Sequence, residues 1–208
     1  PPPRLNCRRQ RQMCIRDRAH TGRTVAFADA SAGQPAIPHD QVQGVLSKAN
    51  VALPPYARTR VGGGGLYSTV PDLAQFMIAH LNQGQVVDTL VLEPETVALM
   101  HRQAVAASGD VGMKGYGMGL NIMHTEPWQY YGHFYDFHGA TGHGGADYGY
   151  LSRMFYVERE EGGYGVILLA SLSKFYDSDL TWFFGIYLKL DNLLMQEAEA
   201  RFLQQTGQ

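Results

Sequence analysis

Residues 147–171, DYGYLSRMFYVEREEGGYGVILLAS, contain two runs rich in aromatic and β-branched side chains. Side chains of these types fit the pleated, half-buried surface of a strand. The segment between the runs, REEGG at residues 159–163, has the composition of a turn. The stretch therefore predicts a β-hairpin, and with it an antiparallel sheet in the second half of the chain.

Two more strands are predicted upstream of this hairpin. YGMGLNIMH, residues 116–124, combines Tyr116 and the β-branched Ile122 with other apolar residues, and GHFYDFHG, residues 132–139, is rich in aromatic residues. Residues 19–60 are irregular and contain four prolines, so we expect loop with short strand pieces there.

The stretch VGGGGLYSTVPDLAQFMIAHLNQG, residues 61–84, predicts an amphipathic helix after its four glycines. Thr69 is the expected N-cap, Pro71 lies in the first turn, and Asp72 follows the cap by three residues as in a capping box. Gly84 is the expected end of the helix. One face of this helix should be apolar, and it carries Leu73, Phe76, Met77 and Leu81.

Two further helices complete the predicted layers. One should begin at Pro94 in LEPETVALMHRQ, where Glu95 favours the positive end of the helix dipole. The other is a long tract from about residue 177 to residue 202. Consecutive antiparallel strands with helices packed against them predict an α+β fold, an antiparallel sheet flanked by helices.

Residues 1–18, PPPRLNCRRQRQMCIRDR, differ in composition from the rest of the chain. They hold six of the 17 basic and one of the 19 acidic residues. QMCIRDR, residues 12–18, matches the translation of a transposon adapter used in sequencing libraries, so we interpret residues 1–18 as an artefactual, non-native segment and residues 19–208 as the native part. The alternative is a native basic arm that binds nucleic acid or anionic lipid.

The native part then has 11 basic and 18 acidic residues, a formal net charge of −7, which argues against nucleic acid as a partner. Both cysteines, Cys7 and Cys14, lie in residues 1–18, so no thiolate site or disulfide is expected elsewhere. The longest apolar runs are interrupted by glycine, lysine, aspartate and asparagine, and no transmembrane segment is predicted.

The stretch TGHGGADYG, residues 141–149, surrounds one histidine, His143, with three glycines. Glycine at this density indicates that a ligand or another chain segment approaches the backbone closely. A glycine-rich turn whose histidine only caps a strand is the alternative, and these residues alone do not decide between the two.

Five motifs in order suggest a family: GGGGLYSTVPDLAQFM, EPETVALM, YGMGL, GHGGADYGYLSRMFYV and GVILLAS. Over residues 56–190 the chain resembles the C-terminal part of the serine β-lactamase-like family, which includes class C β-lactamases, penicillin-binding D,D-peptidases and related esterases. The resemblance implies an incomplete β-lactamase/transpeptidase-like fold whose substrate is a small-molecule or peptide ester or amide.

His143-Gly144-Gly145 matches the family's third motif, Lys-Thr-Gly or His-x-Gly, on the strand beside the active site. The resemblance implies that His143 hydrogen-bonds to the nucleophile's network or to the substrate. It implies that Gly144 and Gly145 let the substrate lie against the strand, and that the backbone N–H of Ala146 forms half of an oxyanion hole. Such a donor typically contributes about 3 kcal/mol of transition-state stabilisation.

The family's first two motifs, Ser-x-x-Lys and Tyr-x-Asn or Tyr-x-Ser, should precede the glycine-rich stretch, and residues 19–60 contain neither. Ser171-x-x-Lys174 and Tyr176-x-Ser178 match formally, but they follow the third motif and lie at a strand-to-helix turn where serine is a common cap. We therefore expect a fragment of a serine hydrolase that is inactive alone because the nucleophile-bearing half is missing.

No metal and no cofactor is implied by this resemblance. Family membership would also place the parent protein in an extracytoplasmic compartment, periplasmic or secreted.

Two other functions stay open at this point. One is a metal site, because five potential ligands lie within fifteen residues, namely His133, Asp136, His138, His143 and Asp147. Against it, His133 and His138 fall on opposite faces of an ideal strand. The other is a non-catalytic binding domain with an aromatic surface formed by Trp128, Tyr130, Tyr131, Phe134 and Tyr135.

Overall fold

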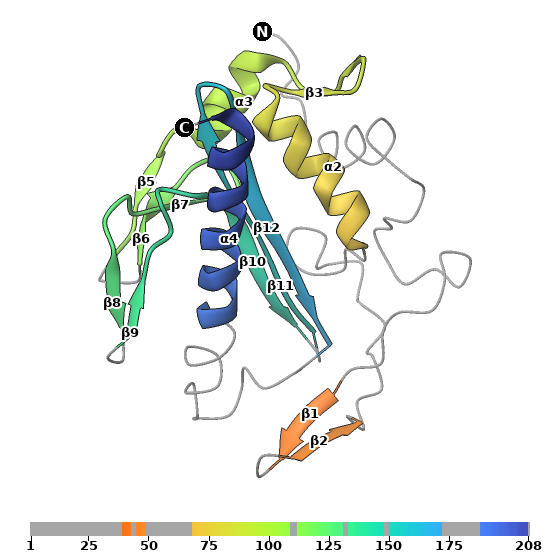
Figure 1. The fold of residues 1–208 in the computed structure, drawn as a ribbon, viewed down its shortest axis with the longest axis vertical. Coiled ribbons are helices and arrows are strands. Elements are labelled where there is room, and N and C mark those ends of the chain that lie inside the picture. The colour runs from red at the N-terminus through yellow and green to blue at the C-terminus, as the bar shows by residue number, and fades with distance from the viewer. Residues whose placement is uncertain are drawn as a thin grey trace, which may run out of the picture.

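The computed structural model describes residues 39–42, 45–48, 68–108, 112–130, 133–147, 150–171 and 188–207. These residues form an α+β fold in which helices lie against an antiparallel sheet, as predicted (Figure 1). The helices are α2 (Val70–Leu81), α3 (Pro94–His101) and α4 (Leu188–Thr206). The strands are β1 (His39–Val42), β2 (Val45–Lys48), β3 (Gln85–Val86), β4 (Thr89–Leu90), β5 (Val105–Ala106), β6 (Met113–Tyr116), β7 (Asn121–Met123), β8 (Trp128–Tyr130), β9 (His133–Tyr135), β10 (Thr141–Asp147), β11 (Tyr150–Arg159) and β12 (Gly162–Ala170).

The main sheet has six strands in the order β12-β11-β10-β7-β6-β5, and every neighbouring pair is antiparallel. The predicted hairpin is confirmed: β11 pairs with β12 from Leu151↔Ala170 to Arg159↔Gly162. Its turn is shorter than REEGG, because only Glu160 and Glu161 lie between the strands. Strand β1 pairs with β2 in a separate hairpin, which agrees with the short strand pieces expected in residues 19–60.

Two strand predictions are corrected. Residues 116–124 are not one strand, since the chain turns between β6 and β7, with Gly119 at φ +87° and Gly117 N–H bonded to the Leu120 carbonyl at 2.8 Å. Residues 132–139 are also not one strand: β9 ends at Tyr135, and a turn follows in which His138 has φ +50°. The side chain of Asp136 accepts a hydrogen bond from the His138 N–H at 2.9 Å, as in an Asx-turn.

Helix α2 covers one face of the β11–β12 hairpin. Its predicted cap is confirmed, because the Thr69 hydroxyl accepts a bond from the Asp72 N–H at 3.4 Å. The helix approaches β12 over two glycines. A Cβ atom at Gly165 would lie 2.6 Å from the Met77 sulfur, and one at Gly163 would lie 2.6 Å from a Leu81 methyl carbon. Because Gly163 and Gly165 have no side chains, α2 can pack close to the backbone of β12.

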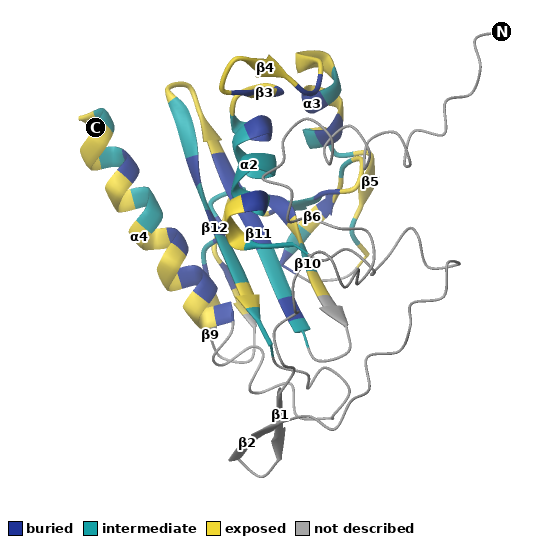
Figure 2. Cartoon of the chain, turned by 90° about the vertical axis from the view of Figure 1, so that its right-hand side faces the viewer, coloured by how far each residue is buried: buried dark blue, intermediate teal, exposed yellow. Residues whose placement is uncertain are grey.

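Helix α4 packs on β12 and contacts β9 from the opposite face of the sheet. The predicted terminal helix is confirmed from Leu188 onward and continues to Thr206, while residues 172–187 lie outside the described residues. Figure 2 shows buried and exposed residues alternating along α4. Its buried apolar side chains join the larger core cluster, which comprises Met123, Trp128, Tyr135, Phe137, Ala140, Phe155, Val157, Tyr164, Val166, Leu188, Met195 and Phe202.

Candidate functional site

Strand β10 carries the His-Gly-Gly motif, and its two sides are paired differently. On one side it pairs with β11 over its whole length, from Thr141↔Tyr156 to Asp147↔Tyr150. On the other side, the described strands pair with it only at Thr141 and Gly142, through β7. We call the part of this second side from His143 to Asp147 the open edge of β10.

The backbone groups that face the open edge follow from the alternation of an antiparallel ladder. The Ala140 carbonyl accepts a bond from the Met123 N–H of β7 at 2.9 Å, so residue 140 presents its backbone to the β7 side. Successive strand residues present their N–H and C=O groups to opposite sides. Gly144 and Ala146 therefore direct their backbone donors and acceptors to the open edge.

His143 lies on the face of the sheet that α2 covers. It pairs with Met154, and Tyr156, two residues along β11 on the same face, contacts His80 of α2. The His143 side chain is exposed. Its Nδ1 is bonded to the Gly144 carbonyl at 2.5 Å. Because a carbonyl can only accept, Nδ1 carries the hydrogen, and Nε2 keeps a lone pair for a further donor.

The glycines of the motif are explained in part by close packing between β10 and β11. A Cβ at Gly142 would lie 2.0 Å from the Met154 carbonyl oxygen, and one at Gly145 would lie 2.7 Å from the Ser152 hydroxyl oxygen. At Gly144 the nearest atom to such a Cβ is 3.3 Å away, a tight contact that leaves room for a Cβ if the neighbour shifts slightly. The chain segment that approaches the bare backbone at Gly142 and Gly145 is therefore β11.

An ion pair that was not predicted from the sequence lies on the opposite face, beneath Gly144. Arg153, the partner of Gly144 in β11, donates from Nε to Asp191 of α4 at 2.8 Å, and its guanidinium lies 4.2 Å from the centroid of Phe155. Burial raises the pKa of Asp191, and the charge of Arg153 opposes this rise. Two sequence features could have indicated this pair. Arg153 is a lone charge in an apolar strand, and Asp191 is a charge in an apolar helical tract.

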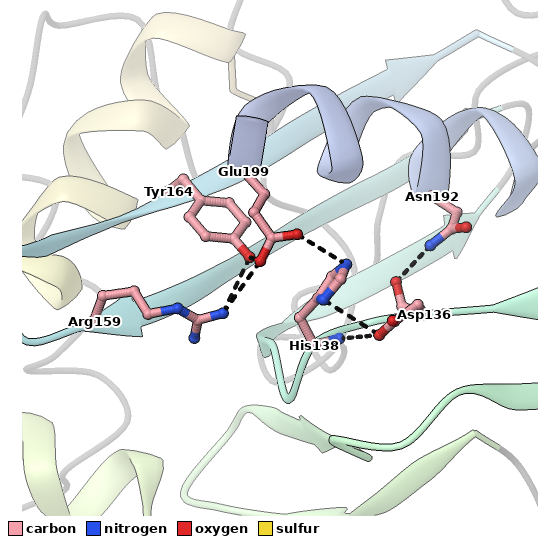
Figure 3. A network of polar contacts seen from close by, with 6 residues as sticks. All are labelled: Asp136, His138, Arg159, Tyr164, Asn192 and Glu199. Atoms are coloured by element: carbon pink, nitrogen blue, oxygen red, sulfur yellow. Dashed lines mark hydrogen bonds and ion pairs between the residues drawn. The ribbon is translucent and has the colours of Figure 1, made fainter. Parts of the chain in front are cut away.

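The metal hypothesis is not supported by the described side chains. His138 lies between two carboxylates, with Nδ1 at 3.4 Å from Asp136 and Nε2 at 3.6 Å from Glu199 of α4 (Figure 3). The two carboxylates thus meet opposite nitrogens of the ring and do not converge with it on one point. In the part of the chain that the structure describes, no three His, Cys, Asp or Glu side chains are placed to hold a metal ion. The side chains of His133 and Asp147 lie outside that part.

Ser171 is remote from His143 along the sheet. His143 pairs with Met154, which pairs with Ile167, so Ser171 lies two strands across and four residues further along. From a strand spacing of about 4.8 Å and a rise of about 3.3 Å per residue, the separation is roughly 16 Å. Its formal partners Lys174, Tyr176 and Ser178 lie outside the described residues.

The proposed aromatic surface is wrong for Trp128 and Tyr135, whereas Phe134 is exposed as that hypothesis requires. Trp128 and Tyr135 are core residues, with 9% and 1% exposure, and their rings contact each other. Phe134 is 71% exposed. The side chain of Tyr130 and the whole of Tyr131 lie outside the described part. The hairpin of β8 and β9 therefore buries alternate aromatics, as a half-buried strand pair should.

Comparison with known proteins identifies one family. A family model described as Beta-lactamase matches residues 15–184, more than four-fifths of the chain. The match contains all five sequence motifs and begins upstream of the first of them. No curated protein matches the chain. Among the described residues, no helix is both long and apolar enough to span a membrane.

Proposed function

We propose that this chain, which belongs to the β-lactamase family, supplies the substrate-binding edge strand of a serine hydrolase. The observation that carries the proposal is the open edge of β10, where an exposed histidine adjoins two residues whose backbone faces outward. The parent protein would cleave an ester or amide through an acyl-enzyme. No metal or other cofactor is needed for that chemistry.

A substrate with an extended backbone could pair with the open edge as an added strand. Gly144 and Gly145 would lie against it without side chains in the way. The N–H of Ala146 would be one of two donors to the oxyanion that forms as the hydroxyl attacks. His143 would accept a hydrogen bond at Nε2 from the substrate or from the groups around the nucleophile.

The nucleophile itself is proposed to lie outside this chain. Residues 68–171 place no Ser-x-x-Lys beside β10, and the late match at Ser171 is roughly 16 Å from His143 by strand geometry. We infer that a preceding segment carries Ser-x-x-Lys and the tyrosine, and that residues 1–18 are not native. Residues 19–208 would then be the C-terminal portion of an extracytoplasmic hydrolase domain.

The test begins with the DNA upstream of codon 19. A gene that encodes Ser-x-x-Lys there should yield a protein that a fluorophosphonate probe labels at that serine, while residues 19–208 alone should remain unlabelled. In the longer protein, Ala146→Pro should lower kcat about 10²- to 10³-fold, because it removes one oxyanion donor. Since that N–H faces the open edge, proline leaves the ladder to β11 intact.

Ala146→Ser keeps the N–H and is the matched control, with near-normal kcat expected. Labelling of the short chain at Ser171 would refute the proposal. So would an Ala146→Pro enzyme with full kcat and an unchanged melting temperature.

A non-catalytic binding domain is the second candidate. It is favoured by the observation that no Ser-x-x-Lys precedes the third motif from Ala19 onward, which also led us to infer a missing nucleophile. A complete gene that lacks this motif, and whose product no fluorophosphonate labels, would establish it.

A further inference from the structure

Four polar side chains meet beneath α2, away from the open edge of β10. Nδ1 of His80, from α2, lies 3.0 Å from Nε2 of His101, at the end of α3. The Tyr156 hydroxyl of β11 lies 2.9 Å from the same His101 nitrogen, and Nδ1 of His101 lies 3.0 Å from a Glu158 carboxylate oxygen. His80 and Tyr156 are both 0% exposed. The His101 side chain is 11% exposed and that of Glu158 46%. We call these four residues the buried histidine cluster, after His80.

The hydrogens of this cluster can be counted. A carboxylate only accepts, so the hydrogen of His101 lies on Nδ1, facing Glu158. Nε2 of His101 then carries no hydrogen and acts as an acceptor. Two groups donate to its lone pair, the Tyr156 hydroxyl and the Nδ1–H of His80. Nε2 of His80 is left as a buried lone pair with no hydrogen-bond partner. With one hydrogen on each imidazole, the single lone pair of His101 Nε2 is shared between these two donors.

An additional proton on His80 has no favourable place in this arrangement. On Nε2 of His80 it would create a buried charge and a buried donor without an acceptor, both of which are costly. The packed site of His80 therefore excludes a proton that the same imidazole would accept in water.

The ring geometry favours a shared hydrogen over a shared metal ion. The centroids of His80 and His101 are 5.1 Å apart with 26° between the planes, and the facing nitrogens are 3.0 Å apart. The centroid separation exceeds the nitrogen separation by 2.1 Å, which is close to the sum of the distances from each centroid to its own nitrogen. The two centroids and the two nitrogens therefore lie nearly on one line, and each ring points a nitrogen at the other. Two imidazoles bound to one zinc ion would instead aim their lone pairs at a common point, at a near-tetrahedral angle.

We propose that the buried histidine cluster is a proton-sensitive latch, which ties α2 and α3 to β11 while His80 is neutral and opens when His80 takes up a proton. The latch joins three elements at one point, and no other contact of similar kind links α2 with α3 among the described hydrogen bonds. Acid should therefore loosen these two helices before it loosens α4.

The surroundings of His80 support the prediction that acid opens the cluster. Burial, and then the neighbouring His101, lower the pKa of His80 from 6.5 to about 3. Of the described groups in contact with His80, the titratable ones are His101 from α3 and Tyr156 from β11, and α2 itself contributes the uncharged Phe76 ring. The charged Glu158 of β11 reaches His80 only through His101. Between pH 6.5 and about pH 3 the opened state thus binds up to one more proton than the closed state, and opening becomes more favourable as the pH falls through this range.

Hydrogen exchange of the full chain tests the latch. Between pH 7 and pH 5, after correction for intrinsic exchange rates, the opening constant of α2 and α3 should rise roughly 25-fold, as linkage to one group of pKa 6.5 requires. His80→Gln should remove most of this dependence. His124→Gln is the matched control, because His124 is exposed and lies outside the cluster. A His80→Gln protein that keeps the full dependence, or a wild type that shows none, would overturn the proposal.

Nitrogen NMR of the wild type keeps the proposal testable if His80→Gln does not fold. At pH 7 both His80 and His101 should carry their hydrogen on Nδ1 and a bare Nε2. A hydrogen on Nε2 of His80 would contradict the latch. Added zinc chloride should leave both histidine signals and the melting temperature unchanged; stoichiometric binding at these two rings would show that the cluster is a metal site.

Discussion

Gly142 and Gly145 both face β11 closely, but what lies opposite each of them differs. A Cβ at Gly142 would meet the backbone of β11, at 2.0 Å from the Met154 oxygen and 2.7 Å from the Phe155 Cα. A Cβ at Gly145 would meet only the Ser152 hydroxyl, at 2.7 Å. A serine side chain can rotate away, whereas a paired strand cannot move without breaking its ladder.

We therefore expect Gly142→Ala to be the more destabilising of two otherwise identical substitutions. It should lower the free energy of unfolding by about 2–3 kcal/mol, the upper part of the range for an overpacked site, and Gly145→Ala by less than about 1 kcal/mol. Urea unfolding followed by circular dichroism measures both. Equal losses would mean that the distance between β10 and β11 is not fixed at Gly142.

At the scale of elements, Glu199 is one of two carboxylates, with Asp191, that hold α4 on the sheet. Glu199 accepts from the Tyr164 hydroxyl at 2.8 Å and from Arg159 at 3.4 Å, and it lies 3.6 Å from His138 in the turn before β10 (Figure 3). Asn192, two turns earlier, donates to the Asp136 carbonyl at 2.5 Å. These contacts connect the last helix to the strand that carries the motif.

The hydroxyl of Tyr164 does not make this connection sensitive to pH near neutrality. Burial, and then its bond to Glu199, raise the pKa of Tyr164 above the ordinary value of 10. A group whose pKa is raised on folding contributes its stability below the unfolded value and loses it as the pH rises through the folded value. The bond is therefore fully present throughout the neutral range.

Replacement of Glu199 should loosen α4 far more than replacement of a neighbouring glutamate. Glu199→Ala should cost about 2 kcal/mol, because the Tyr164 hydroxyl and Arg159 lose a charged acceptor. Within the described part of the chain, the one polar contact of Glu197 is an exposed ion pair with Arg201, and Glu197→Ala should cost less than about 0.5 kcal/mol. Thermal unfolding and hydrogen exchange of α4 compare the two variants, and similar values would show that the network adds no stability.

At the scale of the whole molecule, the important feature is the edge strand β12. It is the outermost strand of the six-stranded sheet among the described residues, with helices against both of its faces. Its run VILLA is apolar, and Leu169 is 38% exposed. A long apolar edge of this kind pairs readily with other chains.

We expect residues 19–208, expressed alone, to be poorly soluble and to associate through β12. Leu169→Lys should raise the monomer fraction in size-exclusion chromatography with light scattering, because a charged edge resists pairing. Leu99→Lys, on α3 at 40% exposure, adds the same charge away from the sheet and should change little. A wild type that is monomeric and melts cooperatively would contradict this prediction.

Features encoded within a few residues were predicted best. The Thr69 cap, Pro94 at the start of α3 and the β11–β12 hairpin depend on local backbone chemistry, and the structure confirms all three. The turn at Gly119 was missed because aromatic and apolar residues continue on both sides of it. The turn at His138 was missed because a non-glycine residue with positive φ is uncommon.

Contacts between distant segments could not be predicted in the same way. His80 and His101 lie in two segments predicted only as helices, and packing on β11 brings them to Tyr156 and Glu158. The position of His143 beside an open edge likewise depends on where β7 ends, which no motif around His143 encodes. The motif resemblance identified the strand, and the pairing of its neighbours determines what that strand can bind.

The order of strands in the main sheet follows the chain closely, and this has a consequence for assembly. From β5 to β12 every pairing joins consecutive strands, except that β7 meets β10 after the small β8–β9 hairpin. Short loops cost little closure entropy, and chains dominated by such near contacts fold fast. The sheet can thus form hairpin by hairpin during synthesis, each new strand adding to one already in place, and α4 arrives last as the element that completes its core.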